Sequence, residues 1–154
     1  MPEKEKLDEL DRRILSILLK DARISYRELA RSLNVSVNTV IRRINDMRER
    51  GILQDFIPVI DAKKVGLDVA VIIGIVVEGG HLVEVERELA RRREVCAVYD
   101  VTGEFDAIVV AKFRNTTELN DFIKSTLSMR HVQRTCTFVV LNVVKEDYRV
   151  YLPE

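Results

Sequence analysis

The stretch from Ser25 to Arg50, SYRELARSLNVSVNTVIRRINDMRER, constrains the fold most, because its pattern is that of two short helices joined by a sharp turn. Ser25 and Glu28 have the spacing of a capping box at the start of the first helix. Ser36 is placed to cap the second helix with its hydroxyl. Because the helical period is interrupted at Asn34, we predict a helix-turn-helix.

The predicted second helix has an apolar side and a polar side, separated at about 100° per residue. Its apolar side is predicted to contain Val37, Val40, Ile41, Ile44 and Met47. Arginine can bind guanine edges, asparagine can bind adenine, and a helix N-terminus can face a phosphate. The alternative is an ordinary helical bundle with a solvated polar face. The candidate DNA-binding residues are Arg27, Ser36, Asn38, Thr39, Arg42 and Arg43.

The charge distribution supports a nucleic-acid partner. The 154-residue chain has no formal net charge, but residues 20–50 contain 8 Lys and Arg against 4 Asp and Glu. Positive charge is therefore concentrated on the predicted helix-turn-helix, where it would attract phosphates of double-stranded DNA. Because the excess is modest, we expect more than one such unit to act together.

Composition argues against several other classes of protein. No apolar run is long enough to span a membrane, and the N-terminus lacks the apolar core of a signal peptide, so we expect a cytoplasmic protein without a membrane partner. Cys96 and Cys136 lack metal-binding spacing, and neither His81 nor His131 forms a ligand cluster with them. We expect no metal and no cofactor, and we expect both cysteines to be buried or half-buried.

The remaining chain predicts an α+β architecture. A helix over 7–20 gives the helix-turn-helix a packing partner, and an extended segment around Pro58 begins a hinge. The order that follows is βαββαβ, a ferredoxin-like sandwich. Its predicted elements are strand 69–77, helix 81–93, strands 95–101 and 106–113, a helix capped by Asn115, and strand 132–144. The predicted domains are 1–52 for DNA binding, 53–66 as hinge, and 67–154 for ligand sensing and dimerisation.

Two of the predicted strands are apolar on both faces. Residues 71–77 and 138–144 are nearly continuous apolar runs, whereas a sheet with one face in water should alternate. The simplest cover for the second face is the same sheet of another chain, so we predict a homodimer through the C-terminal domain. The alternative is that this face packs on the chain's own N-terminal helices.

The motifs LDELDRRIL, DARISYRELA, RRINDMRERGIL and VTGEFDAIV, in this order and spacing, resemble the Lrp/AsnC (feast/famine) family of prokaryotic transcriptional regulators. The resemblance covers essentially the whole chain. It implies a winged helix-turn-helix, a ligand-sensing dimerisation domain, dimers that assemble into tetramers or octamers, and an amino-acid effector. One departure is the turn LNVS, where the family usually has glycine; asparagine tolerates the same left-handed geometry.

The resemblance also implies where the effector binds. By the family's pattern its contacts come from the hairpin after the second strand and from the last strand. Thr135 and Thr137 are two apart and therefore point to one sheet face. Lys124 stands where some relatives carry an acidic group, which implies an acidic ligand or none. The candidate effector-binding residues are Thr102, Gly103, Glu104, Phe105, Asp106, Lys124, Thr135 and Thr137.

The sequence therefore predicts a DNA-binding transcriptional regulator that responds to a small molecule. Three alternatives share its architecture. An architectural protein would wrap DNA with little specificity and a steep salt dependence. A sirohaem decarboxylase would have the same domains, but the hairpin region lacks the His/Pro/aromatic-rich stretch of those enzymes, so we expect no enzymatic activity. A sensor whose helix-turn-helix binds a protein is disfavoured by the positive charge of residues 20–50.

Overall fold

The computed structural model describes residues 7–153, and the chain divides into two compact units. One unit contains the chain up to Pro58 together with the segment from Glu146 onward, and the other is Val59–Lys145. The C-terminal segment contributes Leu152 to the helical core, and Arg12 donates a hydrogen bond to the carbonyl of Pro153. The sequence pattern did not indicate this return of the chain to the first unit.

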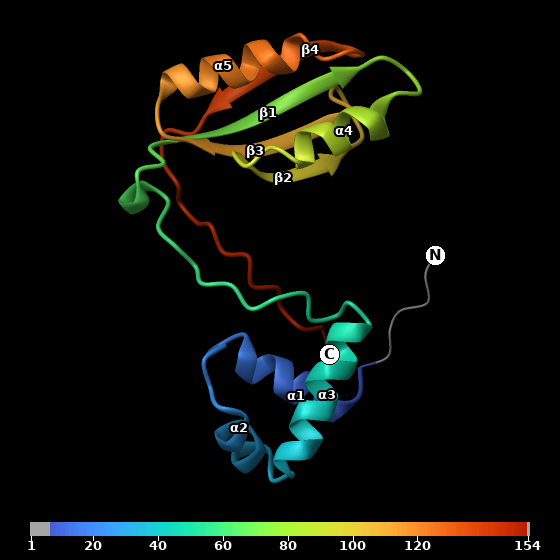
Figure 1. The fold of residues 1–154 in the computed structure, drawn as a ribbon, viewed down its shortest axis with the longest axis vertical. Helices are drawn as coiled ribbons and strands as arrows, with labels where there is room; N and C mark the ends of the chain where they lie inside the picture. The colour runs from blue at the N-terminus through green and yellow to red at the C-terminus, as the bar shows by residue number, and fades with distance from the viewer. Residues whose placement is uncertain (1–6, 154) are drawn as a thin grey trace. The chain divides into compact units, whose positions relative to one another are not determined.

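The described part of the helical unit contains three helices, α1 (Glu9–Leu18), α2 (Tyr26–Leu33) and α3 (Val37–Glu49) (Figure 1). Ser25 and Glu28 form the predicted capping box, and the Ser36 hydroxyl accepts the N–H of Thr39 at 3.0 Å. A second capping box joins Asp8 and Asp11 at the start of α1. Each cap satisfies helix N–H groups that otherwise lack partners, and a cap contributes about 1 kcal/mol.

The turn between α2 and α3 has the predicted left-handed residue. Asn34 has φ 55° and ψ 46° and ends α2. Ile14 of α1, Leu29 of α2 and Ile44 of α3 are fully buried together in the core that fixes the three helices. The prediction that Ile41 faces this core is wrong, because its side chain is 38% exposed. Only the narrower stripe of Val40, Ile44 and Met47 is buried on α3.

The connection between the units is irregular. The extended segment predicted around Pro58 forms no strand among the described residues, and its regular structure is a 3₁₀ turn at Lys63–Val65. Ile52 and Leu53 pack against the helical core. These two residues keep the chain that follows α3 packed against the helical unit.

The second unit has the predicted βαββαβ order. Its four strands are antiparallel in the order β2-β3-β1-β4, and α4 and α5 cover one face of the sheet (Figure 1). The elements are β1 (Val69–Val77), α4 (Leu82–Ala90), β2 (Val95–Asp100), β3 (Ala107–Phe113), α5 (Thr116–Leu127) and β4 (Val132–Val139).

The last strand is shorter than predicted. β4 ends at Val139, and the last backbone hydrogen bond to β1 runs from the N–H of Val140 to the carbonyl of Ala70 at 2.9 Å. Its partner β1 begins at Val69, so the apolar residues beyond 140 have no neighbouring strand to pair with. The apolar run 138–144 does not by itself reveal where the partner strand β1 begins, so it could not predict the end of β4.

The two faces of the sheet differ in cover. Ile73, Ile75 and Val109 lie on the face that packs against the helices, and all three are buried. The opposite face, which we call the open face, contains Ile72 and Phe138 as cross-strand partners, 40% and 52% exposed. The sequence therefore predicted correctly that apolar residues occupy both faces.

The cysteines depart in part from expectation. Cys136 is half-buried, opposite Gly74, but Cys96 is exposed. Cys96 lies on β2, which is an edge strand of the sheet. The prediction that both would be buried or half-buried is wrong for Cys96, because an edge strand is covered on one side only.

Gly74 is required by close packing on the open face. A Cβ built at Gly74 would lie 2.6 Å from Cγ of Phe105. Such overpacking forces a side chain or the backbone to move, at a cost of about 1–3 kcal/mol. We therefore expect Gly74→Ala to lower the free energy of unfolding in urea by that amount. Gly79→Ala is the matched control, since nothing lies within 4 Å of its added Cβ; equal unfolding curves for the two variants would contradict the packing.

Candidate nucleic-acid interface and effector hairpin

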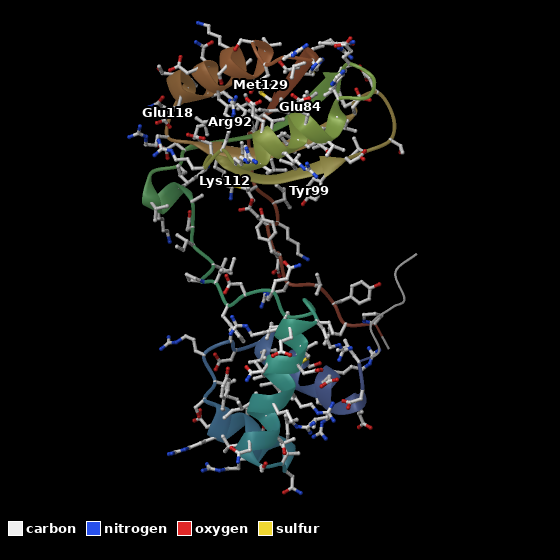
Figure 2. All side chains as sticks on the ribbon, turned by 45° about the vertical axis from the view of Figure 1, so that its right-hand side comes forward. Glu84, Arg92, Tyr99, Lys112, Glu118 and Met129 are labelled. Atoms are coloured by element: carbon white, nitrogen blue, oxygen red, sulfur yellow. The ribbon has the colours of Figure 1, made fainter. Side chains whose placement is uncertain are left out.

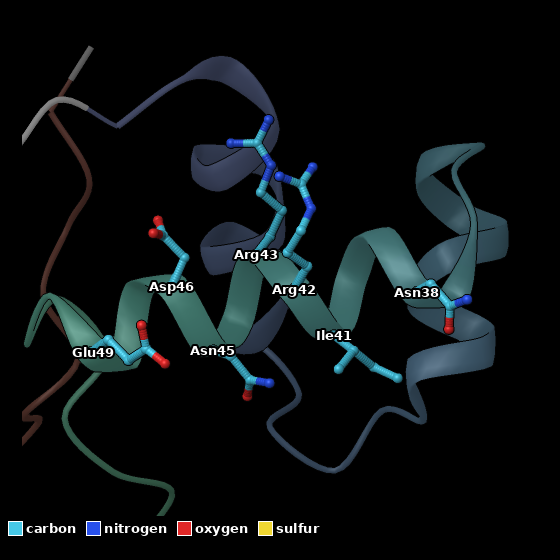
Figure 3. Close-up of a pocket in the computed structure, with 7 residues that line it drawn as sticks. All are labelled: Asn38, Ile41, Arg42, Arg43, Asn45, Asp46 and Glu49. Atoms are coloured by element: carbon cyan, nitrogen blue, oxygen red, sulfur yellow. The ribbon is translucent and has the colours of Figure 1, made fainter.

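The outer face of α3 is the candidate nucleic-acid interface. Asn38, Ile41, Arg42 and Asn45 are exposed and line a shallow surface depression along the helix (Figure 3). In Figure 3, Asn38, Ile41 and Asn45 project from one side of α3, while Arg42 extends from the other. Two amides, an aliphatic group and a guanidinium are the groups that read adenine, the thymine methyl and guanine in a major groove.

Of the six predicted DNA-binding residues, Arg43 has a different environment. Its guanidinium forms ion pairs with Asp8 and, at 3.3 Å, with Asp11 of α1. The Asp11 side chain is 2% exposed, so this contact ties α3 to α1 inside the unit. The hydrogen bond to the neighbouring Asp8 carboxylate raises the pKa of Arg43 above its ordinary value. Arg43 therefore fixes α3 to α1, while its side chain stays 27% exposed beside Arg42, so its contact with DNA remains a prediction.

The ion pair has a testable effect on stability. We expect Arg43→Ala to lower the free energy of unfolding by about 1–3 kcal/mol at neutral pH, because the buried Asp11 carboxylate loses its cation. Arg42→Ala, at an exposed neighbouring position, serves as the control and should leave stability unchanged. Equal stability of the two variants in urea would contradict this role.

The same variant should show a pH dependence. The Asp11 N–H and then Arg43 lower the pKa of Asp8. A lowered pKa in the folded state stabilises the fold above the unfolded pKa, and this stabilisation disappears as pH falls through the folded pKa. The difference between wild type and Arg43→Ala should therefore shrink below pH about 3.9, the ordinary value for aspartate.

Three further predicted residues, Ser36, Thr39 and Arg27, lie at the start of α3 and on α2. Ser36 is the N-cap residue of α3, and its hydroxyl lies 2.8 Å from that of Thr39 in the first turn. Arg27 lies exposed on α2. Because the first turn of α3 has free N–H groups, this end of the helix can face a phosphate while Ser36 and Thr39 hold its geometry.

The β2–β3 hairpin is the candidate effector region. Thr102, Gly103 and Glu104 are exposed, and Gly103 has φ 124°, a conformation that favours glycine. The Asp106 carboxylate accepts the N–H of Val77 at 2.8 Å, so it fastens the hairpin to β1. One oxygen of the Asp106 carboxylate therefore binds the backbone of β1.

Glu104 and Phe105 share a neighbour that the sequence did not reveal. Arg134 of β4 donates a hydrogen bond to Glu104 at 3.1 Å, and its guanidinium lies over the Phe105 ring, 5.6 Å from the centroid. Both members of the ion pair are more than half exposed. The pairing of Arg134 with Val76 places it on the open face beside Gly74, where Phe105 packs.

The predicted threonines lie on the other face. Thr135 pairs with Ile75 and Thr137 with Ile73, so both point to the helix-covered face, as their shared spacing predicted. Lys124 is exposed on α5, which covers that same face. Within one chain the structure therefore does not bring Thr135, Thr137 and Lys124 together with the hairpin residues Glu104 and Phe105. The register of β4 against β1 determines which face Thr135 and Thr137 occupy, whereas their spacing within one strand shows only that they share a face.

Several residues were missed by sequence reasoning. Asn45 and Ile41 belong to the exposed face of α3, which only the packing angle of the helix reveals. His131 lies against Glu78, 53 positions earlier, with Nδ1 2.7 Å from Oε2, and its ring stacks on that of His81. The expectation of no ligand cluster considered sequence spacing alone, so it could not detect a group assembled from three separate segments.

Two family models match the chain, and each lies mainly within one of its two units. Residues 7–54 match a winged helix-turn-helix DNA-binding model, and residues 70–150 match the Lrp/AsnC ligand binding domain. No helix within residues 7–153 has the length and apolar character needed to cross a membrane.

Known proteins resemble the chain over nearly its whole length. An HTH-type transcriptional regulator of Pyrococcus abyssi is 49% identical, covering 94% of this chain and 98% of that one. The regulator FL11 of Pyrococcus furiosus is 34% identical over 91% of this chain and 93% of its own.

Solved structures give the same result. AsnC of Escherichia coli superposes with a TM-score of 0.82 at 28% identity, covering 95% of this chain and all of that one. The leucine response regulatory protein of Mycobacterium tuberculosis has a TM-score of 0.88 at 26% identity, covering 96% and 100%. These relatives are transcription regulators, not enzymes. The chain belongs to the Lrp/AsnC family of DNA-binding transcriptional regulators.

Proposed function

We propose that this regulator is a cytoplasmic, sequence-specific DNA-binding protein that acts as a dimer or a larger assembly of dimers. The observation that carries the proposal is the exposed face of α3, where Asn38, Ile41, Arg42 and Asn45 stand free of the core while capping and packing fix the helix behind them. A rigid helix with base-reading groups on its outer face is the requirement for direct readout.

A dimer supplies what one helix lacks. Two recognition helices related by two-fold symmetry would enter successive major grooves, with half-sites about 34–36 Å apart. Simultaneous binding raises the overall affinity well above that of one unit, which the modest charge excess of residues 20–50 requires.

The experiment is a titration of fluorescent duplexes at one fixed salt concentration. One duplex contains the region upstream of the protein's own gene, and the other is a scrambled sequence of equal composition. A preference of about a hundredfold or more supports sequence-specific recognition, since specific affinities exceed non-specific ones by about 10³ or more. Equal and steeply salt-dependent binding to both duplexes favours the architectural alternative instead.

The proposal includes an amino-acid effector at the hairpin of residues 102–106. Glu104 and Arg134 present opposite charges 3.1 Å apart at an exposed position, and these charges complement the ammonium and the carboxylate of a zwitterion. Thermal-shift titration with each amino acid tests it. Glu104→Gln should remove the shift of any amino acid that stabilises the wild type, whereas an unchanged shift would place the effector elsewhere.

A further inference from the structure

Three residues with metal-binding side chains meet at one end of the sheet of the second unit. One ligand atom from each of Glu78, His81 and His131 lies within 4.8 Å of the other two. Glu78 directly follows β1, His81 stands at the N-cap position of α4, and His131 precedes β4. Three separate segments of the chain therefore converge there, at positions that neither the recognition helix nor the effector hairpin uses.

Backbone hydrogen bonds hold the three residues of this cluster in place without any ligand. The N–H of Glu78 donates to the carbonyl of His131 at 2.8 Å, and the N–H of His81 donates to the carbonyl of Glu78 at 3.2 Å. His131 has φ 72°, an uncommon conformation for a residue other than glycine. Backbone contacts thus bring the three residues together before any ligand binds, so that only side-chain adjustments are left for binding.

The side-chain contacts within the cluster are close. Nδ1 of His131 lies 2.7 Å from Oε2 of Glu78, and the His131 side chain is only 10% exposed. The rings of His81 and His131 are parallel, with centroids 3.4 Å apart and planes within 1°. Glu84 approaches Nδ1 of His81 at 3.6 Å from the first turn of α4 (Glu84 is labelled in Figure 2).

We propose that Glu78, His81 and His131 bind a divalent transition-metal ion of the Zn²⁺ type. Two imidazoles and one carboxylate are a donor set that such ions prefer, and water would complete the coordination. Calcium and magnesium are disfavoured, because they prefer oxygen ligands.

The present geometry needs only local adjustment to accept the ion. Zinc binds imidazole nitrogen and carboxylate oxygen at about 2.0–2.2 Å, so tetrahedral geometry separates two ligand atoms by about 3.3 Å. The contact between His131 and Glu78 would therefore widen slightly as the metal replaces the shared proton. The His81 ring must turn out of its stack, because the lone pair lies in the ring plane, and Glu84 can then accept its Nδ1–H while Nε2 binds the metal.

The test uses the full-length chain, freed of metal by chelation and titrated calorimetrically with Zn²⁺. We expect one Zn²⁺ per chain, and visible absorption bands of tetrahedral Co²⁺ when Co²⁺ is the probe. His131→Asn, chosen because asparagine tolerates the left-handed conformation, and Glu78→Gln should each weaken binding at least about tenfold. The chain has only two histidines, so both ring systems can be followed individually by NMR.

The control variant carries Cys96→Ser and Cys136→Ser, which removes both thiols of the chain. It should bind Zn²⁺ as the wild type does; loss of binding there would assign the metal to sulfur and overturn the proposal. Melting in chelator checks that His131→Asn and Glu78→Gln are folded, and Zn²⁺ should raise the melting temperature of the wild type and of the cysteine variant more than that of either site variant. Unchanged affinity in both variants, or no binding by the wild type, would also overturn it.

Discussion

Arg42→Ala is expected to reduce affinity for the specific duplex by about 1–3 kcal/mol, or about five- to 150-fold, while scrambled DNA loses much less. Arg42 is exposed on α3, and its guanidinium can make a bidentate contact to a guanine edge. A lost base contact removes discrimination at one position of the site, so sequence preference should relax as affinity falls. The measurement is the duplex titration at fixed salt, repeated with single-base changes in each half-site.

Arg27→Ala is the matched control for this prediction. Arg27 is also an exposed arginine, but it lies on α2, which precedes the recognition helix. A phosphate contact there should weaken binding to all sequences alike and reduce the salt slope by about one. If Arg42→Ala also weakened both duplexes equally, Arg42 would be a phosphate-binding residue and direct reading by this side chain would be excluded.

Local features of the fold could be predicted because each depends on a few neighbouring residues. The capping box of Ser25 and Glu28, the cap at Ser36 and the left-handed turn at Asn34 all lie as expected. The bounds of β1 were also predicted correctly, since Gly and charged residues flank a nearly continuous apolar run. In these cases the group that needs a partner and the partner itself lie within a few residues of each other in the sequence.

Features that depend on distant partners could not be predicted. Arg43 lies 35 positions from Asp8, and periodicity places its side chain near the boundary of the polar face without naming an ion-pair partner. The end of β4 depends on where β1 begins, and the face of Thr135 depends on its register against Ile75. The candidate site is therefore least predictable where it is assembled from several strands.

The open face of the sheet predicts that the chain assembles into at least a dimer. Ile72, Tyr99 and Phe138 leave this face partly apolar and 40–53% exposed in one chain. Exposed apolar surface of this kind is typical of an interface, and two such sheets stack about 10 Å apart. We expect the wild type to have at least twice the 17.8 kDa mass of one chain in analytical ultracentrifugation.

Phe138→Asp should convert this assembly to the 17.8 kDa monomer, because the interface would bury a carboxylate without a cation. Val83→Asp is the matched control, since Val83 is 57% exposed on α4, away from the open face, and should leave the mass unchanged. Circular dichroism separates dissociation from unfolding.

The same Phe138→Asp variant connects assembly to DNA binding. A monomer presents one recognition helix, so the second binding event is no longer intramolecular, and affinity for a two-half-site duplex should fall by about a hundredfold or more. Affinity for a single half-site should stay the same, because α3 belongs to the other unit of the chain. If Phe138→Asp kept the wild-type mass, the open face would not be the dimer interface, and the exposed apolar residues would need another partner.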